Sequence, residues 1–529
     1  MSDRQQTAFQ FRLAELLVTL SLVADLAMGH EPEEAVCACF LATQLARKMG
    51  LAEPEVSHVY YTTLLRFTGC TSYAHEEAKF SAGDDVAMRA AGAYRDFGNA
   101  RDAATFFLFD LARDAPLWRR VGAVLRTLAQ GQKGTNEMFR SHCEVAVMVA
   151  RRLGLGTAVQ QALYHVFERW DGQGEPQQLS QEAIVLPARL AQVAFEAVMF
   201  YRLGGTEAAC AAVTRLAGGA LDPRVANAFL ENGPDLLAEL ATLDACQAVV
   251  EIEPQPHVHL SESGFDDVAR AFADVADLKV PYCRGHSPAV AKLARTAAAQ
   301  LGLAEADVTL LYRAALLHDI GRVGIANGIW EKPGPLTRSE WEQVRLHPYH
   351  SERILSCSPV LAPLAALAGM HHERLDGSGY YRQATAAVIP MTARILAAAD
   401  AYQAMTQKRP YRPAFTPEAA AEELRAGVEK GQFDGTAVQA VLAAAGHQTA
   451  SRARAWPAGL SDREVEVLLL ITRELSNKQI AGELHISPKT VGHHVQHIYN
   501  KIGVSTRAGA AMFAMEHDLL VPKQSSYLG

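Results

Sequence analysis

The sequence partly repeats itself, and this repeat constrains the fold more than any other feature. The tetrapeptides "VADL" from Val23 and "GLAE" from Gly50 both return 252 residues later. Residues 168–189 align without a gap with residues 373–394, at an offset of 205. Copies of about 200 residues are too long for the units of a solenoid, so we expect two duplicated domains. The change of offset gives the first copy about 47 extra residues, which we place around 81–132.

The composition predicts a helical protein with ordinary hydrophobic cores. Apolar residues make up 49% of the chain and charged residues 20%, which is usual for a globular protein. Alanine, leucine and arginine are abundant, and long alternations of β-branched residues are missing, so we expect an all-α fold. The segments 251–263 ("EIEPQPHVHLSES") and 447–458 predict linkers. The expected domains are therefore residues 1–250, 264–446 and 459–529.

Nothing in the sequence predicts a membrane partner or an exported protein. No stretch approaches the ~20 uninterrupted apolar residues of a membrane helix. The apolar run near the N-terminus contains Glu15 and Asp25 and has no basic leader, which argues against a signal peptide. The eight cysteines are scattered, which favours the reducing cytoplasm. The net charge of −8 means that any contact with nucleic acid needs a local basic patch.

The second copy contains seven residues with metal-ligating side chains. Imidazoles and carboxylates together suit borderline metals such as iron, manganese or zinc. Each histidine alone is more often a hydrogen-bonded core or surface residue than a ligand, but the set as a whole predicts a metal site. The candidates are His286, His318, Asp319, His347, His371, His372 and Asp400.

The first copy supplies an internal control for this interpretation. Its residues at the matched positions are Glu34, Arg66, Phe67, His142, Val166, Phe167 and Phe195. Five of the seven cannot ligate a metal, and the apolar ones would fill the space that a metal and its ligands need. The shared pattern "ERxDGxG" is therefore expected to serve the fold, and the differing residues to form the site.

Residues 265–445 resemble the HD-GYP domain, a branch of the HD phosphohydrolases. The resemblance rests on "GHSPAVAKLARTAAAQLGL", "ALLHDIGRVGI", "HHERLDGSGY" and "IPMTARILAAADAYQAMTQKRPYRP". It implies two tandem HD-type helical bundles, the first without its metal site. Members of the family bind two or three metal ions, usually iron or manganese, with zinc, magnesium or nickel as alternatives. They hydrolyse cyclic di-GMP.

The resemblance also implies roles for the ligands. Asp319 is expected to bridge two divalent metals, with His286, His318 and Asp400 on one and His347, His371 and His372 on the other. Two metals held close together can activate a water molecule and clamp the phosphate that it attacks. Tyr282 stands where three-metal members carry a glutamate, so we expect two metals. Asp319 and Arg322 are the expected catalytic residues.

Several residues near these ligands are candidates for substrate contact. Arg322 stands where the family commonly has a lysine. Gln403 replaces a frequent aspartate, and Tyr381 replaces the proline of the signature. For the other arginines, a solvated helix surface is an equal alternative. The candidates are Arg322, Gly379, Tyr380, Arg394, Arg409 and Arg412.

The C-terminal segment 460–510 predicts a DNA-binding module. Ser461 and Glu464 form a capping-box pattern, and Ser487 precedes Pro488 as an N-cap precedes the first helical residue. Ile480, Ala481 and Leu484 give the preceding helix an inner face. The pattern "SPKTVxxHxxxIxxKIGV" closely resembles the four-helix LuxR-type helix-turn-helix domain, which implies a bacterial transcription regulator.

The resemblance and residue polarity point to one set of expected DNA contacts. The charges of this module nearly balance, so we expect modest monomer affinity and a homodimer on promoter DNA. A small helical protein-interaction domain is the alternative. The candidates are Lys489, Thr490, Val491, His493, His494, Gln496, His497 and Lys501.

Three functional hypotheses follow from these patterns. The first is a transcription regulator whose HD-GYP domain binds two metals and hydrolyses cyclic di-GMP. The second is a switch in which metals and a cyclic dinucleotide set DNA binding without turnover. The third is an HD phosphohydrolase that acts on another phosphate ester.

Overall fold

The computed structural model describes residues 11–113, 115–447, 456–472 and 475–504, and single positions between 506 and 519. The chain divides into two compact units, residues 1–447 and 448–529. The described residues form helices joined by short loops, with one pair of two-residue strands. The expected all-α fold is therefore confirmed.

The first copy begins with a short strand and continues as helices. Its elements are β1 (Phe11–Arg12), α1 (Leu13–Met28), α2 (Glu34–Lys48), α3 (Glu53–Leu65), η1 (Cys70–Tyr73), α4 (Ala74–Phe80), α5 (Asp85–Ala93), α6 (Ala100–Thr105), the π-helical turn η2 (Phe106–Asp110), α7 (Leu117–Arg152), α8 (Thr157–Tyr164), η3 (Gln181–Ala183), α9 (Leu186–Leu216), α10 (Pro223–Leu240) and α11 (Ala245–Glu251).

The second copy has the same plan. Its elements are β2 (His259–Leu260), α12 (Glu262–Leu278), η4 (Pro281–Cys283), α13 (His286–Gln300), α14 (Glu305–Leu317), η5 (Ile320–Gly324), α15 (Asn327–Trp330), α16 (Arg338–Arg345), α17 (His347–Leu355), α18 (Ala362–Ala368), α19 (Met391–Thr406), α20 (Pro417–Glu429) and α21 (Gly435–Ala444).

The sequence repeat is also a repeat of helices. Helices α2 and α3 begin 252 residues before α13 and α14, and α8 and α9 begin 205 residues before α18 and α19. The segment 81–132, where we expected the insertion, contains α5, α6, η2 and the first half of α7. Helix α7 bends at Gly131, which has a φ of 56°. The first copy therefore carries an additional helical segment between its two matched blocks.

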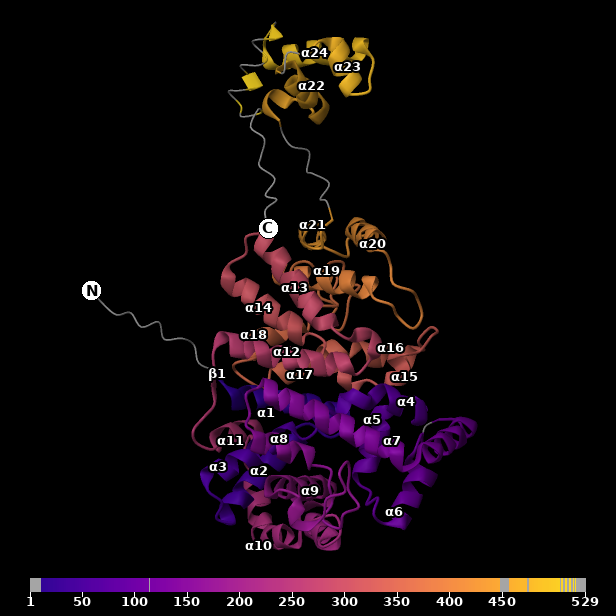
Figure 1. Cartoon of the computed structure of the whole chain (residues 1–529), viewed down its shortest axis with the longest axis vertical. Coiled ribbons are helices and arrows are strands. Elements are labelled where there is room, and N and C mark those ends of the chain that lie inside the picture. Colours follow the sequence, from indigo (N-terminus) through magenta and orange to yellow (C-terminus); the bar gives the residue numbers. More distant parts are fainter. Residues whose placement is uncertain are drawn as a thin grey trace, which may run out of the picture. The chain divides into compact units, whose positions relative to one another are not determined.

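The two copies meet through a reciprocal contact. Helix α1 packs on η5 and α17 of the second copy, and α12 packs on η1 and α7 of the first (Figure 1). Thr71 donates a hydrogen bond to the carbonyl of Val275 at 2.6 Å, and Leu26 packs so closely on Gly324 that a Cβ there would lie 2.5 Å from its Cγ. Because α1 matches α12 and η1 matches η5, the interface is pseudo-symmetric.

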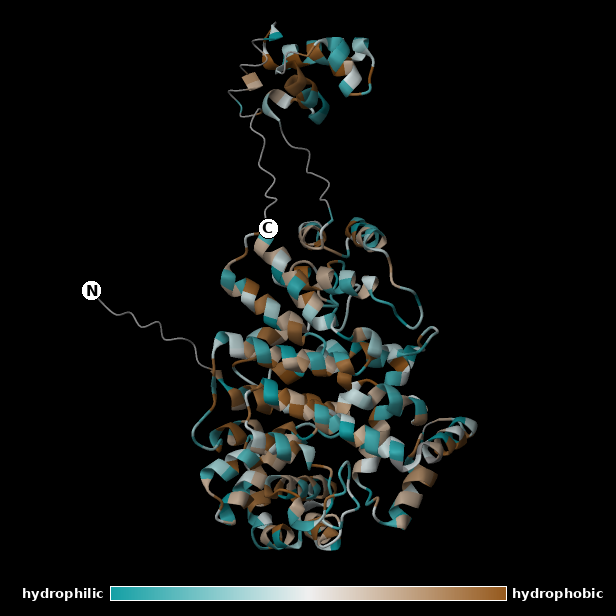
Figure 2. Ribbon diagram, in the orientation of Figure 1, coloured by the Kyte–Doolittle hydropathy of each residue, from teal (hydrophilic) through white to brown (hydrophobic). Residues whose placement is uncertain are grey.

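Helix α1 is apolar on nearly all sides because it lies between the copies. Leu13, Leu16, Leu17 and Leu20 are all buried, as expected for a helix enclosed by protein. Figure 2 shows hydrophobic residues along the helices that meet at this junction. None of the helices in the described residues has the length and hydrophobicity needed to cross a bilayer.

The segment that we expected to be a linker, residues 251–263, is packed against the first copy. Strand β2 pairs antiparallel with β1, and Phe11 stands opposite Leu260. Glu253 is buried, where it accepts hydrogen bonds from Arg12 Nε at 2.9 Å and from the Tyr61 hydroxyl at 2.7 Å. These bonds tie the segment to both ends of the first bundle.

The C-terminal unit contains η6 (Pro457–Gly459), α22 (Asp462–Thr472), α23 (Asn477–Glu483) and α24 (Pro488–Ile502). The expected capping box forms: Ser461 N donates to Glu464 Oε2 at 2.7 Å, and Glu464 N donates to Ser461 Oγ at 3.3 Å. Ser487 caps α24 by accepting from the backbone N–H of Thr490 at 3.1 Å. The expected fourth helix falls on residues 505–520, of which only single positions are described.

Candidate metal centre

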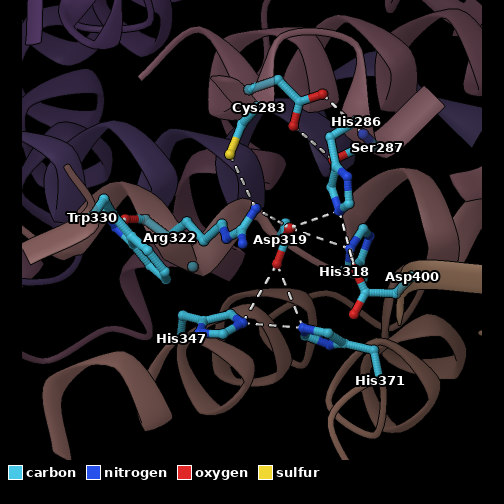
Figure 3. A network of polar contacts seen from close by, with 12 residues as sticks. Cys283, His286, Ser287, His318, Asp319, Arg322, Trp330, His347, His371 and Asp400 are labelled. Carbon is cyan, nitrogen blue, oxygen red and sulfur yellow. Dashed lines mark hydrogen bonds and ion pairs between the residues drawn. The ribbon is translucent and has the colours of Figure 1, made fainter. Parts of the chain in front are cut away.

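The second copy brings its seven predicted ligands to one place. They come from five elements: His286 begins α13, His318 and Asp319 follow α14, His347 begins α17, His371 and His372 follow α18, and Asp400 lies within α19. Figure 3 shows Asp319 at the centre of the group. The bundle therefore assembles in space what the sequence spreads over more than a hundred residues.

The two carboxylate oxygens of Asp319 face two different groups of imidazoles. Its Oδ2 lies 3.6 Å from His286 Nε2 and 3.2 Å from His318 Nε2. Its Oδ1 lies 3.5 Å from His347 Nε2 and 3.4 Å from His371 Nε2. Asp319 thus stands between the two sets of ligands, where a bridging carboxylate would be.

Asp400 and His372 complete these two sets. Asp400 Oδ1 lies 3.1 Å from His286 Nε2, and its Oδ2 lies 3.7 Å from His372 Nδ1. The ligand atoms of His286, His318 and Asp400 all lie within 4.8 Å of one another, and so do those of His347, His371 and His372. This grouping matches the expected division of the ligands.

Hydrogen bonds to the backbone orient three of the rings. The Nδ1 atoms of His318, His347 and His371 donate to the carbonyl oxygen three residues earlier, at 2.7, 2.6 and 2.6 Å respectively. A carbonyl can only accept, so Nδ1 carries a proton and Nε2 is the ring atom that faces Asp319 and is available to a cation. His286 differs, because its Nδ1 lies 3.0 Å from Gln407 Oε1.

Burial without hydrogen bonds indicates that the centre is built for cations. His318 Nε2 and Asp319 Oδ1 are buried and have no hydrogen-bond partner, whereas Asp319 Oδ2 is paired with Arg322 Nη1 at 2.7 Å. Burial opposes the ionisation of Asp319, but Arg322 and His318 hold its pKa well below the ordinary value. Burial lowers the pKa of His347 and of His372, whereas at His318 burial is overcome by Asp319 and Asp400, which raise the pKa to about 10. Imidazoles around a buried carboxylate fit divalent metal ions, which displace ring protons when they bind.

The matched positions of the first copy contain a buried arginine in an aromatic cage. Arg66, at the position of His318, lies 5.2 Å from the ring centre of Phe67, 5.0 Å from that of Phe195 and 5.6 Å from that of Phe167. These rings take the places of Asp319, Asp400 and His372. Within the described residues, the clusters that could hold a metal all lie in the second copy.

Arg322 lies beside the centre. Its Nη1 is 2.7 Å from Asp319 Oδ2 and donates to Cys283 Sγ at 3.4 Å. Its guanidinium stacks on Trp330, 4.8 Å from the ring centre. Trp330 and Cys283 were not predicted from the sequence, because an isolated tryptophan and an isolated cysteine carry no motif.

Tyr282 and Arg409 form a second stack next to Arg322. The guanidinium of Arg409 lies 4.8 Å from the ring centre of Tyr282, and its Nη1 donates to Cys283 Sγ at 3.4 Å. The Tyr282 hydroxyl donates to the carbonyl of Trp330 at 2.6 Å, so this side chain is tied to α15. Arg409 therefore borders the centre, and its contact with substrate stays a prediction.

Arg394 serves the fold, which argues against its predicted contact with substrate. Its Nη1 donates to Asp434 Oδ2 at 2.9 Å, and Asp434 caps α21. The first copy contains the same pair, since Arg189 donates to Asp222 Oδ2 at 2.6 Å and Asp222 caps α10. Because the first copy has this pair without the metal ligands, we infer that the pair stabilises the fold that both copies share.

The structure also gives Arg412 and Gly379 structural roles. Arg412 donates to the carbonyls of Ala404, Met405 and Pro413, so its guanidinium is committed to its own loop. A Cβ on Gly379 would lie 2.4 Å from Arg374 N, so the loop needs glycine there for close packing. Both Nη atoms of Arg412 are thus engaged within its own loop, and contact of Arg412 or Gly379 with substrate stays a prediction.

Tyr380 remains a candidate for substrate contact. Its ring lies 4.7 Å from the ring of His372, at the edge of the ligand set. The following peptide bond, Tyr380–Tyr381, is cis, as is the matched bond Glu175–Pro176 in the first copy. The loop therefore has the same backbone form in both copies although only one of them has proline.

The exposed face of α24 contains most of the predicted DNA contacts. Val491 is the exception: it is buried in the core of the C-terminal unit with Ile498, so the expectation that it touches the groove is wrong. Lys501 is paired with Glu464 Oε2 at 2.6 Å. The others are partly or fully exposed: Lys489, Thr490, His493, His494, Gln496 and His497.

Comparisons with known proteins agree with this division of the chain. The family model described as "HD domain" matches residues 107–225 and 270–437, one segment in each copy. The family model described as "Bacterial regulatory proteins, luxR family" matches residues 458–514.

Two curated relatives and one solved structure are informative. The chain is 34% identical over 420 residues to "3′3′-cGAMP-specific phosphodiesterase 3" of Vibrio cholerae, across 78% of this chain and 90% of the relative. It is 40% identical over 148 residues to the "Cyclic di-GMP phosphodiesterase response regulator RpfG" of Xanthomonas campestris, across 27% of this chain and 39% of that protein. A crystal structure of a cyclic GMP-AMP specific phosphodiesterase of V. cholerae matches 83% of this chain and 98% of its own, at 28% identity and a TM-score of 0.58.

Proposed function

Because this chain belongs to the HD domain family, as a homologue of the HD-GYP phosphodiesterases with a luxR-type domain at its C-terminus, we propose that it hydrolyses a cyclic dinucleotide and regulates transcription. The observation that carries the proposal is the position of Asp319 between two sets of imidazole ligands. Among the described residues, only the second copy has this arrangement, although both copies have the same helical plan. The ligand set, and not the fold, therefore supports the proposed activity.

The seven ligands would hold two divalent metal ions. His286, His318 and Asp400 would hold one ion and His347, His371 and His372 the other, with Asp319 as a ligand common to both. Bound there, iron or manganese would supply Lewis-acid chemistry for phosphodiester hydrolysis. The Nδ1–carbonyl bonds fix the ring tautomers in advance, so the ligand set is preorganised.

Other residues of the chain would bind the substrate and stabilise the charge on its phosphate. Arg322 keeps its charge at any working pH and lies beside Asp319, so we assign it to the phosphate oxygens, where negative charge develops during hydrolysis. Tyr380, whose ring lies against His372, is positioned to contact a base or sugar of the substrate. Arg409 borders the same region through its contact with Cys283.

The relative with coverage of both copies favours 3′3′-cGAMP over cyclic di-GMP as the first substrate to test. Among the relatives that match a smaller part of the chain, some are named for cyclic di-GMP and others for 3′3′-cGAMP. Both are cyclic dinucleotides with two phosphodiester bonds, so the same metal centre suits either. A second candidate function, a binding switch without turnover, is favoured by the departures at Arg322, Gln403 and Tyr381.

One experiment separates these functions. Purified full-length protein is analysed for metal content and incubated with 3′3′-cGAMP, cyclic di-GMP and bis-p-nitrophenyl phosphate, beside Asp319→Ala. Two equivalents of metal with hydrolysis of a cyclic dinucleotide support the enzyme. Two equivalents of metal with no turnover, but with tight nucleotide binding, would support the switch. Turnover of the synthetic ester alone would support another phosphate ester as substrate.

DNA binding is the second part of the proposal. The exposed residues Lys489, His493 and His497 lie on α24, the helix that would enter the major groove. We propose that homodimers bind paired half-sites and that the nucleotide controls this binding. Electrophoretic mobility shifts with a promoter library, with and without each nucleotide, test the coupling. Identical shifts under all conditions would contradict it.

A further inference from the structure

We infer that the inserted segment of the metal-free copy positions Arg322 of the metal centre, and that Asp85 is the residue through which it acts. The inference rests on the proposed role of Arg322 in hydrolysis. Asp85 lies within the segment 81–132 that the first copy has in addition to the shared plan, and it begins α5. Its side chain is fully buried, although α5 otherwise belongs to the outer part of the first copy.

Asp85 is bound to the second copy. Its Oδ2 accepts from Lys279 Nζ at 2.9 Å, and both side chains are 0% exposed. Its Oδ1 accepts from the backbone N–H of Asn327 at 2.7 Å. A buried ion pair adds little net stability, because desolvation offsets the attraction. The contribution of this pair is therefore the geometry that it imposes.

Asp85 fixes the position of α15, a helix of only four residues. The first N–H groups of a helix have no partner within it, and a helix this short has few other bonds. The first copy supplies two acceptors: Asp85 Oδ1 for Asn327 N, and the carbonyl of Gly83 for Gly328 N at 2.7 Å. The fit is tight, since a Cβ on Gly328 would lie 2.7 Å from Gly83 Cα.

The other end of α15 holds Arg322. Trp330 is the last residue of this helix, and its ring stacks under the guanidinium of Arg322 at 4.8 Å. Its Nε1 donates to the carbonyl of Arg322 at 3.4 Å, and its ring lies 5.7 Å from the ring of His347. Figure 3 shows Trp330 next to Arg322 and on the side away from His286. A displacement of α15 would therefore move the support of Arg322.

The test uses two double variants that differ in one group. Asp85 Oδ2 also lies 3.2 Å from Arg89 Nη1, but Arg89 keeps its ion pair with Glu77 when Asp85 is replaced. Lys279→Met therefore removes the cation that would otherwise be left buried and unpaired. In that background, Asp85→Asn keeps an oxygen for the N–H of Asn327, and Asp85→Ala removes it. We expect Asp85→Ala/Lys279→Met to lower kcat about 10-fold, because small displacements of a catalytic group have effects of this size. KM and metal content should not change, and Asp85→Asn/Lys279→Met should stay within about 2-fold of the wild type.

A double-mutant cycle with Arg322→Ala distinguishes positioning from general stability. If Asp85 acts through Arg322, its removal should have no further effect on kcat once Arg322 is absent. If Arg322→Ala is impaired and removal of Asp85 lowers its kcat further by the same factor as in the wild type, this inference is wrong and the proposed function still stands. Full hydrolysis by Arg322→Ala would overturn the proposed role of Arg322, and the inference with it.

Hydrogen exchange provides a readout that does not depend on turnover. In the full chain, the peptide covering residues 322–331 should exchange about 10-fold faster in Asp85→Ala/Lys279→Met than in the Asn variant. Equal exchange would overturn the inference even if the protein proved to be a switch. Should the double variants not fold, Gly328→Ala serves instead, because it pushes α15 from Gly83 and leaves both charges in place. It should speed the same exchange, and an unchanged rate would overturn the inference.

Discussion

The two copies accommodate positive charge at the same place in opposite ways. In the second copy, carboxylates and imidazoles come together in groups that could hold metal cations. In the first copy, Arg66 brings the cation as a side chain, and the faces of Phe67, Phe167 and Phe195 surround it. Cation–π contacts of this kind stabilise a desolvated guanidinium. The comparison teaches that a metal site can be lost by substituting a covalently attached cation, with little change in the bundle around it.

The loop that follows the shared "ERxDGxG" pattern is held by the same hydrogen bonds in both copies. Glu373 accepts from the backbone N–H groups of Arg382 and Ala384. Glu168 accepts from those of Gln177 and Leu179, the matched residues of the first copy. The acidic residue of the shared pattern therefore closes the same loop whether or not the copy holds ligands.

The largest expected effect comes from the residue between the two ligand sets. Asp319→Ala should reduce metal content from two equivalents to less than one, because both sets lose a shared carboxylate. Hydrolysis should fall by about 10³-fold or more, as when a catalytic unit loses a member. Elemental analysis and nucleotide chromatography measure these quantities. The matched variant Phe67→Leu is the control: a loss of metal in that variant would contradict the separation of the two copies.

The next effect tests the shared packing. A Cβ on Gly321 would lie 2.2 Å from the carbonyl oxygen of His347, and one on Gly69 would lie 2.0 Å from that of His142. Gly321→Ala and Gly69→Ala should each lower the free energy of unfolding by about 1–3 kcal/mol, the usual range for overpacking. Only Gly321→Ala should also lose metal, because His347 carries a ligand. Denaturant titrations and metal analysis check both expectations.

Gly334→Ala is the control for these glycine variants, because a Cβ at Gly334 meets no atom within 4 Å. Its stability should be that of the wild type. If Gly69→Ala and Gly321→Ala were equally neutral, the tight turn would not be a shared requirement of the two bundles.

A third prediction uses the pH dependence of the first copy. Burial raises the pKa of Glu34, the counterpart of His286, from 4.5 to about 7. Between these values the folded chain holds a proton that the unfolded chain has released, so stability falls as pH rises through this interval. Glu34→Gln should therefore be more stable than the wild type by about 1–3 kcal/mol above pH 7, and equal to it below pH 4.5.

The sign of this difference in stability shows whether the first copy, like the second, has a site for a cation. If the first copy bound a cation at Glu34, deprotonation would strengthen binding, and the wild type would gain stability at high pH. Thermal unfolding between pH 4.5 and 8 measures the difference. Glu239→Gln is the control, since Glu239 is exposed near the end of α10, and its curve should follow that of the wild type.

The smallest expected effect tests whether DNA binding is independent of the metal-binding copy. Lys489 is exposed near the start of α24, whereas Lys501 is held by Glu464 and by the carbonyl of Gly459. Lys489→Ala should weaken duplex binding a few-fold and reduce the salt slope by about 1. Lys501→Ala should do less, and metal content should stay the same in both. Equal losses would show that the ion pair opens on DNA.

The ligand set could be predicted from the sequence because the repeat isolates it. Matched positions that change from His or Asp to Phe or Val mark chemistry, and positions that do not change mark the frame. The roles of the arginines could not be predicted in this way. Arg322 and Arg394 have the same side chain, and what separates them is a partner, Asp434, that the bundle brings to one of them only.

The error at Val491 was avoidable from the helical period. Val491 and Ile498 are seven residues apart, so they lie on one face of α24 and are buried together. The contact between Asp85 and Lys279 was not predictable, because 194 residues separate the two. The sequence indicated only that an additional segment existed, and the contacts of Asp85 and Gly83 with the second copy could be seen only in the structure.

The reciprocal packing of α1 and α12 has a consequence for the history of the chain. The largest hydrophobic core is continuous across both copies, and includes Leu16 and Phe40 from the first and Phe272 and Leu316 from the second. Two domains with a common interior are expected to fold and unfold as one cooperative unit. Deletion of the first copy would expose the apolar residues that it shares with the second, so packing alone is a reason for the chain to keep a copy without metal ligands.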